Sequence, residues 1–281
     1  MSDFSKGAKR LVPQSLQEPA RKTWYALHRA RQWPAASFHP WRRSSMHHLA
    51  NLRNAYQGKR CFIIGNGPSL KQTDLSRLQG EYTFGMNRIY LLFPELGFTT
   101  TFFLSVNDLV IEQCTPDILA LPIPKFLSWR SRELIRPLIK NGGRLPETPP
   151  LVFLHTTYTG PRFATDARQR LWEGATVTYV ALQLAYHMGF SQVILIGVDH
   201  SYSTKGKPNT TVISQGDDPN HFAGNYFGKG FRWQLPDLDT NEQAYAMARR
   251  AYADAGREVL DATISGKLKI FPKVEYDTLF L

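Results

Sequence analysis

The stretch Cys61-Phe-Ile-Ile-Gly-Asn-Gly-Pro-Ser-Leu70 decides the fold class. Its first four residues form a short apolar run, as expected of a buried strand, and Gly65 and Gly67 allow a tight turn close to a ligand. Ser69 can cap a helix that follows, and the N-terminus of such a helix favours phosphate. This order is typical of the first unit of a nucleotide-binding α/β fold. A tight turn without a ligand has the same pattern, so the motif alone is not specific.

Asparagine recurs where predicted strands end. Asn66, Asn87 and Asn107 each follow or end a short apolar run. The carboxyl ends of parallel strands meet at one edge of a sheet, and open α/β sheets bind their ligands at that edge. An amide both donates and accepts hydrogen bonds, which suits ribose hydroxyls or the edge of a base. Each asparagine alone is more often a turn residue, but three in succession favour a binding site.

The second half of the chain contains another α/β unit. A helix is predicted over 175–188, between Gly174 and Gly189, and an apolar strand over 192–197 leads into Asp199 and His200. The other expected elements are strands over 61–64, 82–87, 98–106, 151–154 and 259–263, a helix over 242–255 and a proline-rich, partly helical insertion over 115–150. Together they predict an α/β fold with a Rossmann-like, mostly parallel sheet flanked by helices.

Residues 200–240 are rich in turn residues and lack a clear period. A loop of this length is usually functional or disordered, and its many aromatic residues argue against disorder. We therefore predict a lid over this segment. His221 belongs to it, beside Asp217, Asp218 and Asn220.

The charge is concentrated at one end of the chain. The 281 residues carry 34 Lys and Arg against 23 Asp and Glu, a net charge of +11. Residues 1–60 hold 12 basic and 2 acidic residues, a net charge of +10, which leaves +1 for the rest. We divide the chain into a basic arm over 1–58 and a nucleotide-binding domain over 59–281. Two cysteines, Cys61 and Cys114, exclude a disulfide framework or a four-cysteine zinc site and indicate buried thiols.

The arm has the composition of a segment that meets an anionic surface. A helix is predicted over 18–33, and tryptophans alternate with basic residues there and around Trp41, Arg42 and Arg43. Packing on the protein's own domain or on a partner subunit explains the arm equally well. No signal peptide or membrane span is recognisable, so we expect a cytoplasmic protein, peripheral at the inner face of the membrane if the arm binds lipid. No motif indicates nucleic-acid binding, and assembly into a homo-oligomer is left open.

The motifs resemble those of known families. Gly65-Asn-Gly-Pro-Ser-Leu70, Met86-Asn87, Val106-Asn107 and Gly189-Phe-Ser-Gln-Val-Ile-Leu-Ile-Gly-Val-Asp199 resemble motifs of the bacterial lipooligosaccharide sialyltransferases. Residues 60–281 as a whole resemble a broader group of proteins associated with surface polysaccharide. That group includes the archaeal 6-hydroxymethylpterin pyrophosphokinases, the MptE-like proteins.

The sialyltransferase resemblance implies a transferase that uses a CMP-activated, sialic-acid-like sugar and no metal. The residues it places on the nucleotide are Gly65, Asn66, Gly67, Ser69, Asn87, Asn107, Gly174, Thr176 and Thr178. It implies a tyrosine beside the departing phosphate, for which Tyr202 is the candidate. Lys205 or Arg232 could also offset the negative charge that grows on this phosphate. It also implies a lid histidine as the base, for which His221 and His200 compete. The acceptor would be a surface glycan or a glycolipid.

Two other functions stay open. The MptE-like resemblance implies transfer of pyrophosphate from ATP to a pterin-like substrate, with magnesium held by carboxylates such as Asp199, Asp217 and Asp218. Alternatively, the protein is an inactive module that binds a nucleotide-sugar or a polysaccharide. The basic, tryptophan-bearing arm favours the glycosyltransferase, because a soluble pterin needs no membrane contact whereas a glycolipid acceptor lies at a membrane.

Overall fold

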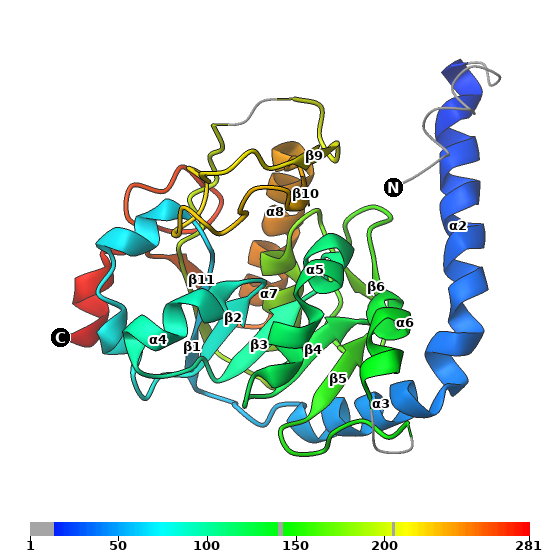
Figure 1. Ribbon diagram of the computed structural model, residues 1–281, viewed down its shortest axis with the longest axis horizontal. Helices are drawn as coiled ribbons and strands as arrows, with labels where there is room; N and C mark the ends of the chain where they lie inside the picture. Colours follow the sequence, from blue (N-terminus) through cyan, green and yellow to red (C-terminus); the bar gives the residue numbers. More distant parts are fainter. Residues whose placement is uncertain (1–13, 140–142, 204–205) are drawn as a thin grey trace.

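Seven parallel strands form the central sheet of the computed structural model, which describes residues 14–139, 143–203 and 206–281 (Figure 1). The order across the sheet is β11-β8-β1-β2-β3-β4-β5, and every neighbouring pair is parallel. The strands are β1 Arg60–Ile64, β2 Thr83–Met86, β3 Phe102–Ser105, β4 Lys125–Ser128, β5 Leu151–Leu154, β8 Gln192–Ile196 and β11 Glu258–Asp261. This sheet confirms the predicted α/β, Rossmann-like fold.

Both faces of the sheet are buried, so its strands are apolar throughout. In β1, Cys61 and Ile63 belong to one core cluster and Phe62 and Ile64 to the other, because successive side chains point to opposite faces. The first cluster includes residues of α7 Val177–Met188 and α8 Leu238–Asp254, and the second includes residues of α5 Asp108–Ala120. Two short helices, α4 Phe93–Leu96 and α6 Arg132–Ile135, complete the layers.

The strand order reverses direction beside β1. From β1 the chain builds the sheet outward through β2, β3, β4 and β5, and it then returns to place β8 on the opposite side of β1, with β11 beyond it. The chain connections that follow β1 and β8 therefore continue to opposite sides of the sheet. In open α/β sheets this switch point is the place where ligands bind.

The insertion predicted over 115–150 is wrong. This stretch completes α5 and contains β4, an internal strand of the sheet. The sequence of this stretch lacks the apolar pattern of a buried strand, because prolines lie in the helix and before the strand and a lysine begins β4. The structure accommodates Lys125 because its buried Nζ donates to the carbonyl oxygens of Leu121 and Ile123, at 2.6 and 3.0 Å. Pro116 lies within α5.

The α-helix predicted after the glycine turn is also wrong. Residues Pro68–Gln72 form a 3₁₀ helix of five residues, whose N-cap is Gly67 without a side-chain hydrogen bond. Ser69 therefore does not cap it. So short a helix cannot build the macrodipole on which a phosphate site at its start would depend.

The described part of the basic arm, residues 14–58, forms two helices in different surroundings. The first, α2 Gln14–Phe38, is longer than the helix predicted over 18–33 and projects from the body at the right of Figure 1. The second, α3 Pro40–Leu52, packs on β5. Trp41 stacks on Phe153 with ring centroids 5.7 Å apart, and Arg42 is buried. These two residues therefore pack on the protein's own domain, and membrane contact through them is wrong.

The predicted lid is largely irregular and carries one antiparallel hairpin, β9 Thr211–Ile213 and β10 Arg232–Gln234. Its aromatic residues Phe222, Tyr226, Phe227 and Trp233 are buried, as expected of an ordered segment. A second small pair, β6 Thr156–Thr157 and β7 Leu171–Trp172, precedes α7. Within the described ranges, no helix combines the length and the apolarity needed to cross a bilayer.

Candidate functional site

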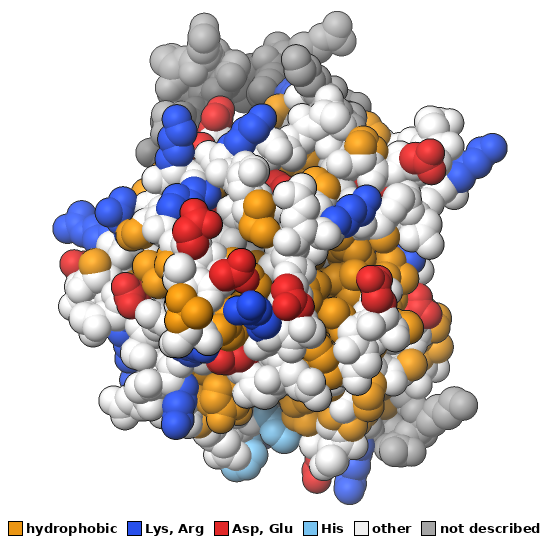
Figure 2. All heavy atoms as spheres, turned by 90° about the vertical axis from the view of Figure 1, so that its left-hand side faces the viewer, with side chains coloured by type: hydrophobic (Ala, Val, Ile, Leu, Met, Phe, Trp, Pro, Cys, Tyr) orange, Lys and Arg blue, Asp and Glu red, His pale blue; other side chains and the backbone are white. Residues whose placement is uncertain are grey.

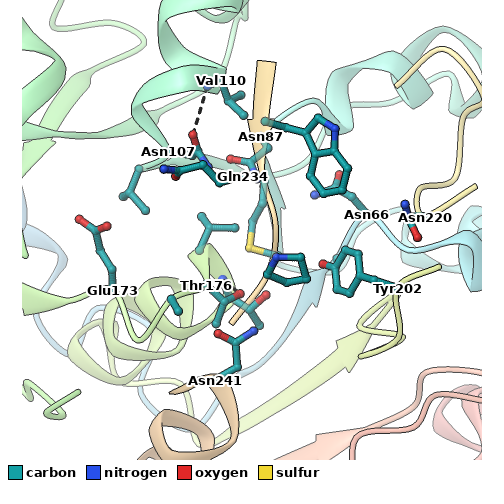
Figure 3. A pocket seen from close by; sticks show the side chains of 18 of the residues that line it. Asn66, Asn87, Asn107, Val110, Glu173, Thr176, Tyr202, Asn220, Gln234 and Asn241 are labelled. Atoms are coloured by element: carbon teal, nitrogen blue, oxygen red, sulfur yellow. Dashed lines mark hydrogen bonds between the residues drawn. The ribbon is translucent and has the colours of Figure 1, made fainter. Parts of the chain in front are cut away.

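A cleft of about 450 Å³ lies at the carboxyl ends of the strands (Figure 3). The loops after β1, β2, β3 and β8 form its base, and the start of α7 and the lid form its walls. Its lining is mostly uncharged and polar, with several aromatic rings. The amides are Asn66, Asn87, Asn107, Asn209, Asn220, Gln234 and Asn241, and the rings include Tyr158, Tyr202, Phe227, Trp233 and Tyr245.

The glycines of the first turn pack against the loop after β8. A Cβ atom at Gly65 would lie 2.1 Å from the carbonyl oxygen of Gly197, and one at Gly67 would lie 1.7 Å from Asp199 Oδ2. Because the protein's own chain fills this space, close packing of two loops explains both glycines without a ligand. We had expected them to bring the backbone close to a nucleotide. Both residues nevertheless line the cleft.

Asp199 occupies the position where a phosphate was expected. Its Oδ2 accepts from Ser69 Oγ at 2.8 Å, and its Oδ1 accepts from the Ser69 backbone N–H at 3.2 Å. Burial raises the pKa of this carboxyl, and the hydrogen bonds from Ser69 act in the opposite direction. Asp199 lines the cleft but Ser69 does not. The Ser69 hydroxyl and N–H are therefore committed to Asp199 and do not face the cleft as the resemblance implies.

The three predicted asparagines are brought together in the cleft (Figure 3). Asn107 is the N-cap of α5, and its Oδ1 accepts from the N–H groups of Leu109 and Val110. Asn87 adopts a left-handed φ of 54° and accepts from Ser105 Oγ. In both side chains the oxygen is engaged, so the amide nitrogen is the group left for a ligand.

Asn66 differs from the other two because its Oδ1 is buried without a hydrogen-bond partner. Such an acceptor costs free energy until a donor reaches it. The backbone oxygen of Asn66 accepts from the N–H of Phe222 at 2.9 Å, which joins the first turn to the lid.

The start of α7 reaches the cleft with two of the three predicted residues. Thr176 is the N-cap and accepts from the N–H of Thr178, and both line the cleft. The N-terminus of this twelve-residue helix favours negative charge nearby. Gly174 does not line the cleft. A Cβ atom there would lie 2.5 Å from that of Ala244, so the glycine allows α8 to pack closely.

His221 is paired with a buried carboxylate. Its Nδ1 donates to Asp218 Oδ2 at 2.7 Å, and its ring lies parallel to that of Tyr226 with centroids 4.0 Å apart. The carboxylate fixes the tautomer, so Nε2 is the nitrogen left to accept a proton. The histidine lines the cleft and is largely shielded from solvent.

His200 also lines the cleft, but its partner is exposed. Its Nε2 lies 3.0 Å from Glu242 Oε1, and its backbone has a left-handed φ of 54°. The side chain of Glu242 is half exposed, whereas that of Asp218 is 5% exposed. A buried carboxylate holds a histidine more firmly, because water competes less for it. The geometry therefore favours His221 over His200 as a base.

Tyr202 extends from the loop after β8 into the cleft (Figure 3). Tyr202 is 38% exposed, but the walls of the cleft shield its phenol from part of the solvent. This desolvation, together with the nearby Tyr245, Asp199 and Asp218, raises the pKa of Tyr202 to about 12. The hydroxyl thus keeps its proton at neutral pH and can donate a hydrogen bond. Of the two cations expected near it, Arg232 pairs with Glu112 and does not line the cleft, and Lys205 lies outside the described residues.

Sequence reasoning missed a charged group at the other end of the cleft. Arg130 follows β4 and forms ion pairs with Asp108 and Glu173. Burial alone would lower the pKa of Arg130, but the two carboxylates raise it above its ordinary value. The sequence marks Arg130 only as a polar residue just after a strand, and the sequence pattern does not predict that strand, β4.

The carboxylates proposed for magnesium do not converge. Asp199 binds Ser69, Asp218 binds His221, and Asp217 is exposed. Within the residues that the structure describes, no group of three or more His, Cys, Asp or Glu side chains is placed to hold a metal ion.

Comparison with known proteins adds little to this geometry. No protein-family model and no curated protein matches the sequence. Among solved structures, the chain is similar to that of MAf glycosyltransferase from Magnetospirillum magneticum AMB-1, with a TM-score of 0.46 and 13% identity. The match covers 84% of this chain and 38% of that chain, so this chain spans well under half of that protein's length. The resemblance to sialyltransferases and MptE-like proteins thus stays a prediction.

Proposed function

We propose that this protein is a glycosyltransferase that moves a sugar from a nucleotide-activated donor to a hydroxyl of a glycan or glycolipid. The observation that carries the proposal is the pair of His221 and Asp218 in an amide-rich cleft at the switch point of the sheet. A donor nucleoside and an acceptor sugar both present many hydroxyls, which amide side chains recognise without a charge.

His221 supplies the base in this proposal. Attack on the anomeric carbon requires an acceptor oxygen that loses its proton as the new bond forms. With Nδ1 committed to Asp218, Nε2 accepts that proton, and the buried carboxylate stabilises the imidazolium that results. The C–O bond to the donor phosphate breaks in the same step, and its electron pair leaves with the phosphate.

Tyr202 and the start of α7 act on the leaving group. Tyr202 keeps its proton at neutral pH and donates a hydrogen bond to the phosphate oxygen as negative charge develops there. The N-terminus of α7, at Thr176, supplies a favourable dipole. The motifs around Asn66, Asn87 and Asn107 favour a CMP-sugar as the donor, with a sialic-acid-like sugar.

Ligand-dependent thermal stabilisation tests the donor class. CMP or CDP at about 100 times its Kd should stabilise the protein by about 2.7 kcal/mol, without added metal. ATP with magnesium should have no such effect. Stabilisation by ATP and magnesium alone would contradict the proposal and favour the pyrophosphokinase.

Hydrolysis of a CMP-sugar then separates an enzyme from a binding module. Release of CMP from CMP-N-acetylneuraminate should depend on His221, because the reaction with water uses the same base as the transfer. Binding of CMP without turnover of any CMP-sugar would instead support the inactive module.

A further inference from the structure

One side of α2 is exposed although it carries large apolar residues. Leu27 is 65% exposed, Trp33 55% and Phe38 68%. A soluble protein rarely exposes such residues together unless they meet a partner. We call this side the outer face of α2, and define it as Leu27, Ala30, Arg31, Pro34 and Phe38. Trp33 lies to one side of it, with its ring centroid 5.7 Å from that of Phe38.

The helical period separates the outer face from the side that holds α2 to the domain. Leu27, Arg31, Pro34 and Phe38 follow one another at steps of four, three and four residues and are all exposed. Arg29 and Ala36, seven residues apart, lie on the opposite side. Ala36 is buried in the core. The outer face is therefore the free side of a helix whose other side is already occupied.

Two hydrogen bonds tie α2 to the rim of the cleft. Arg29 Nη1 donates to Thr159 Oγ1 at 2.9 Å, and Arg170 Nη2 donates to the carbonyl oxygen of Arg29 at 3.3 Å. Thr159 directly follows Tyr158, which lines the cleft. The outer face thus has a fixed orientation relative to the mouth of the cleft, and it is not a loose tail.

The charged residues of the segment that carries the outer face are all basic. No Asp or Glu occurs between Glu18 and Asp74 in the sequence. Arg31 and Arg43 are exposed. An apolar strip with flanking cations matches the boundary of an anionic bilayer, where apolar side chains enter the acyl region and the cations meet lipid phosphates.

A second copy of the chain fits this face less well. Pairing two identical faces about a two-fold axis near Arg31 would bring Arg31 toward its own copy, with no Asp or Glu within residues 19–73 to compensate. We infer that the outer face of α2 docks this protein on an anionic membrane surface. A glycolipid acceptor would then meet the cleft at the bilayer. That last step rests on the proposed function, whereas the docking itself does not.

Vesicle sedimentation with the full chain tests the docking. Vesicles of phosphatidylglycerol and phosphatidylcholine at about 3:7 should bind the protein, and vesicles of pure phosphatidylcholine should bind it at least about tenfold more weakly. Raising the salt from about 0.05 to 0.3 M should weaken the binding. Trp33→Ser with Phe38→Ser should reduce binding about tenfold or more, and Arg31→Glu should reduce it on anionic vesicles.

Matched substitutions elsewhere provide the controls. Ile213→Ser and Arg250→Glu change an exposed apolar residue and an exposed cation far along the chain, and vesicle binding should not change. Unchanged melting temperatures would show that all variants fold.

Equal binding by the α2 variants and the wild type would overturn the inference. So would a dimer in vesicle-free solution that Trp33→Ser with Phe38→Ser dissociates, because it would assign the face to a second copy. Nucleotide binding, measured on the same samples, tests the proposed function separately.

Discussion

The pair of His221 and Asp218 yields a prediction about single side chains. His221→Ala should lower the turnover of a CMP-sugar by about 10²–10⁴-fold and leave nucleotide affinity nearly unchanged, because it removes the base and no nucleotide contact. Asp218→Asn should give a smaller loss, since the imidazole stays but its tautomer is no longer fixed. The measurements are steady-state kinetics and nucleotide titration.

His200→Gln is the matched control for that experiment. His200 lines the same cleft, but its partner Glu242 is exposed. Turnover in this variant should stay within about threefold of the wild type. Loss of turnover on His200→Gln, with activity retained on His221→Ala, would move the base to His200.

A second residue, His155, should set part of the pH dependence of stability. Burial, with the nearby Arg170, Arg42 and Arg130, lowers the pKa of His155 to about 3. Its ordinary value is 6.5, so below that pH the unfolded chain binds a proton that the folded protein does not. Stability therefore falls as the pH falls below about 6.5. The loss from this group is about 1.4 kcal/mol between pH 7.5 and pH 5.5.

Urea unfolding at both pH values checks this effect. His155→Leu should reduce the acid loss of stability by about 1.4 kcal/mol, because the titrating group is gone. The same substitution at the exposed His47 is the matched control for removal of a histidine. An equal acid loss in wild type and His155→Leu would show that His155 does not carry it.

Among the elements, the lid owes its position to a residue that sequence reasoning did not single out. Arg88 follows Asn87, and its Nη1 donates to the carbonyl oxygens of Asn225 and Tyr226. Its backbone N–H donates to the Tyr226 hydroxyl at 3.2 Å. Since the Tyr226 ring stacks on His221, Arg88 links the loop after β2 to the histidine.

Replacing Arg88 should loosen the lid. Arg88→Lys loses the planar fork that reaches both carbonyls, so the free energy of local opening over 216–231 should fall by about 1–3 kcal/mol. Hydrogen exchange measures this opening directly. Arg232→Lys is the control, because Arg232 lies on β10 at the end of the lid and pairs with Glu112 on the surface. Equal exchange in wild type and Arg88→Lys would contradict this role for Arg88.

The elements also show which parts of the fold can be predicted. The strand β8 and the helix α7 were predictable, since the strand is a continuous apolar run and the helix ends at Gly189 with a left-handed φ of 94°. The strand β4 was not, because burial of Lys125 depends on two carbonyl oxygens that the fold places around it. Arg130 was missed together with that strand.

In the cleft, too, some residues could be predicted from the sequence and some contacts could not. Asn66, Asn87 and Asn107 could be grouped in advance, since parallel strands end at one edge. The partner of Asp199 could not, because only the pairing of β1 with β8 brings Ser69 beside it. Contacts of this kind join segments about 130 residues apart and leave no local pattern.

For the molecule as a whole, the net charge of +11 divides into an arm and a nearly neutral domain. The face in Figure 2 shows basic and acidic side chains interspersed. Within residues 1–60, however, several cations are already used: Arg53 pairs with Asp166, Arg60 with Glu81, and Arg42 is buried. Among the cations whose side chains the structure describes there, Arg31 and Arg43 are exposed.

Two truncations should show that α3 belongs to the folded domain and α2 does not. Deletion of residues 1–34 removes most of α2 and leaves His39 to cap α3, so the melting temperature should stay within about 3 °C of the wild type. Deletion of 1–58 also removes Trp41 and Leu49, each worth about 3–5 kcal/mol in a core. It leaves Phe153 without the Ser45 hydroxyl that accepts its N–H.

The longer truncation should therefore unfold or aggregate, as circular dichroism and size-exclusion chromatography would show. The shorter one should keep nucleotide binding and lose binding to anionic vesicles. A stable 59–281 fragment with the wild-type melting temperature would mean that α3 contributes nothing to the core. In that case all of 1–58 would be an appendage, and the domain would begin at β1.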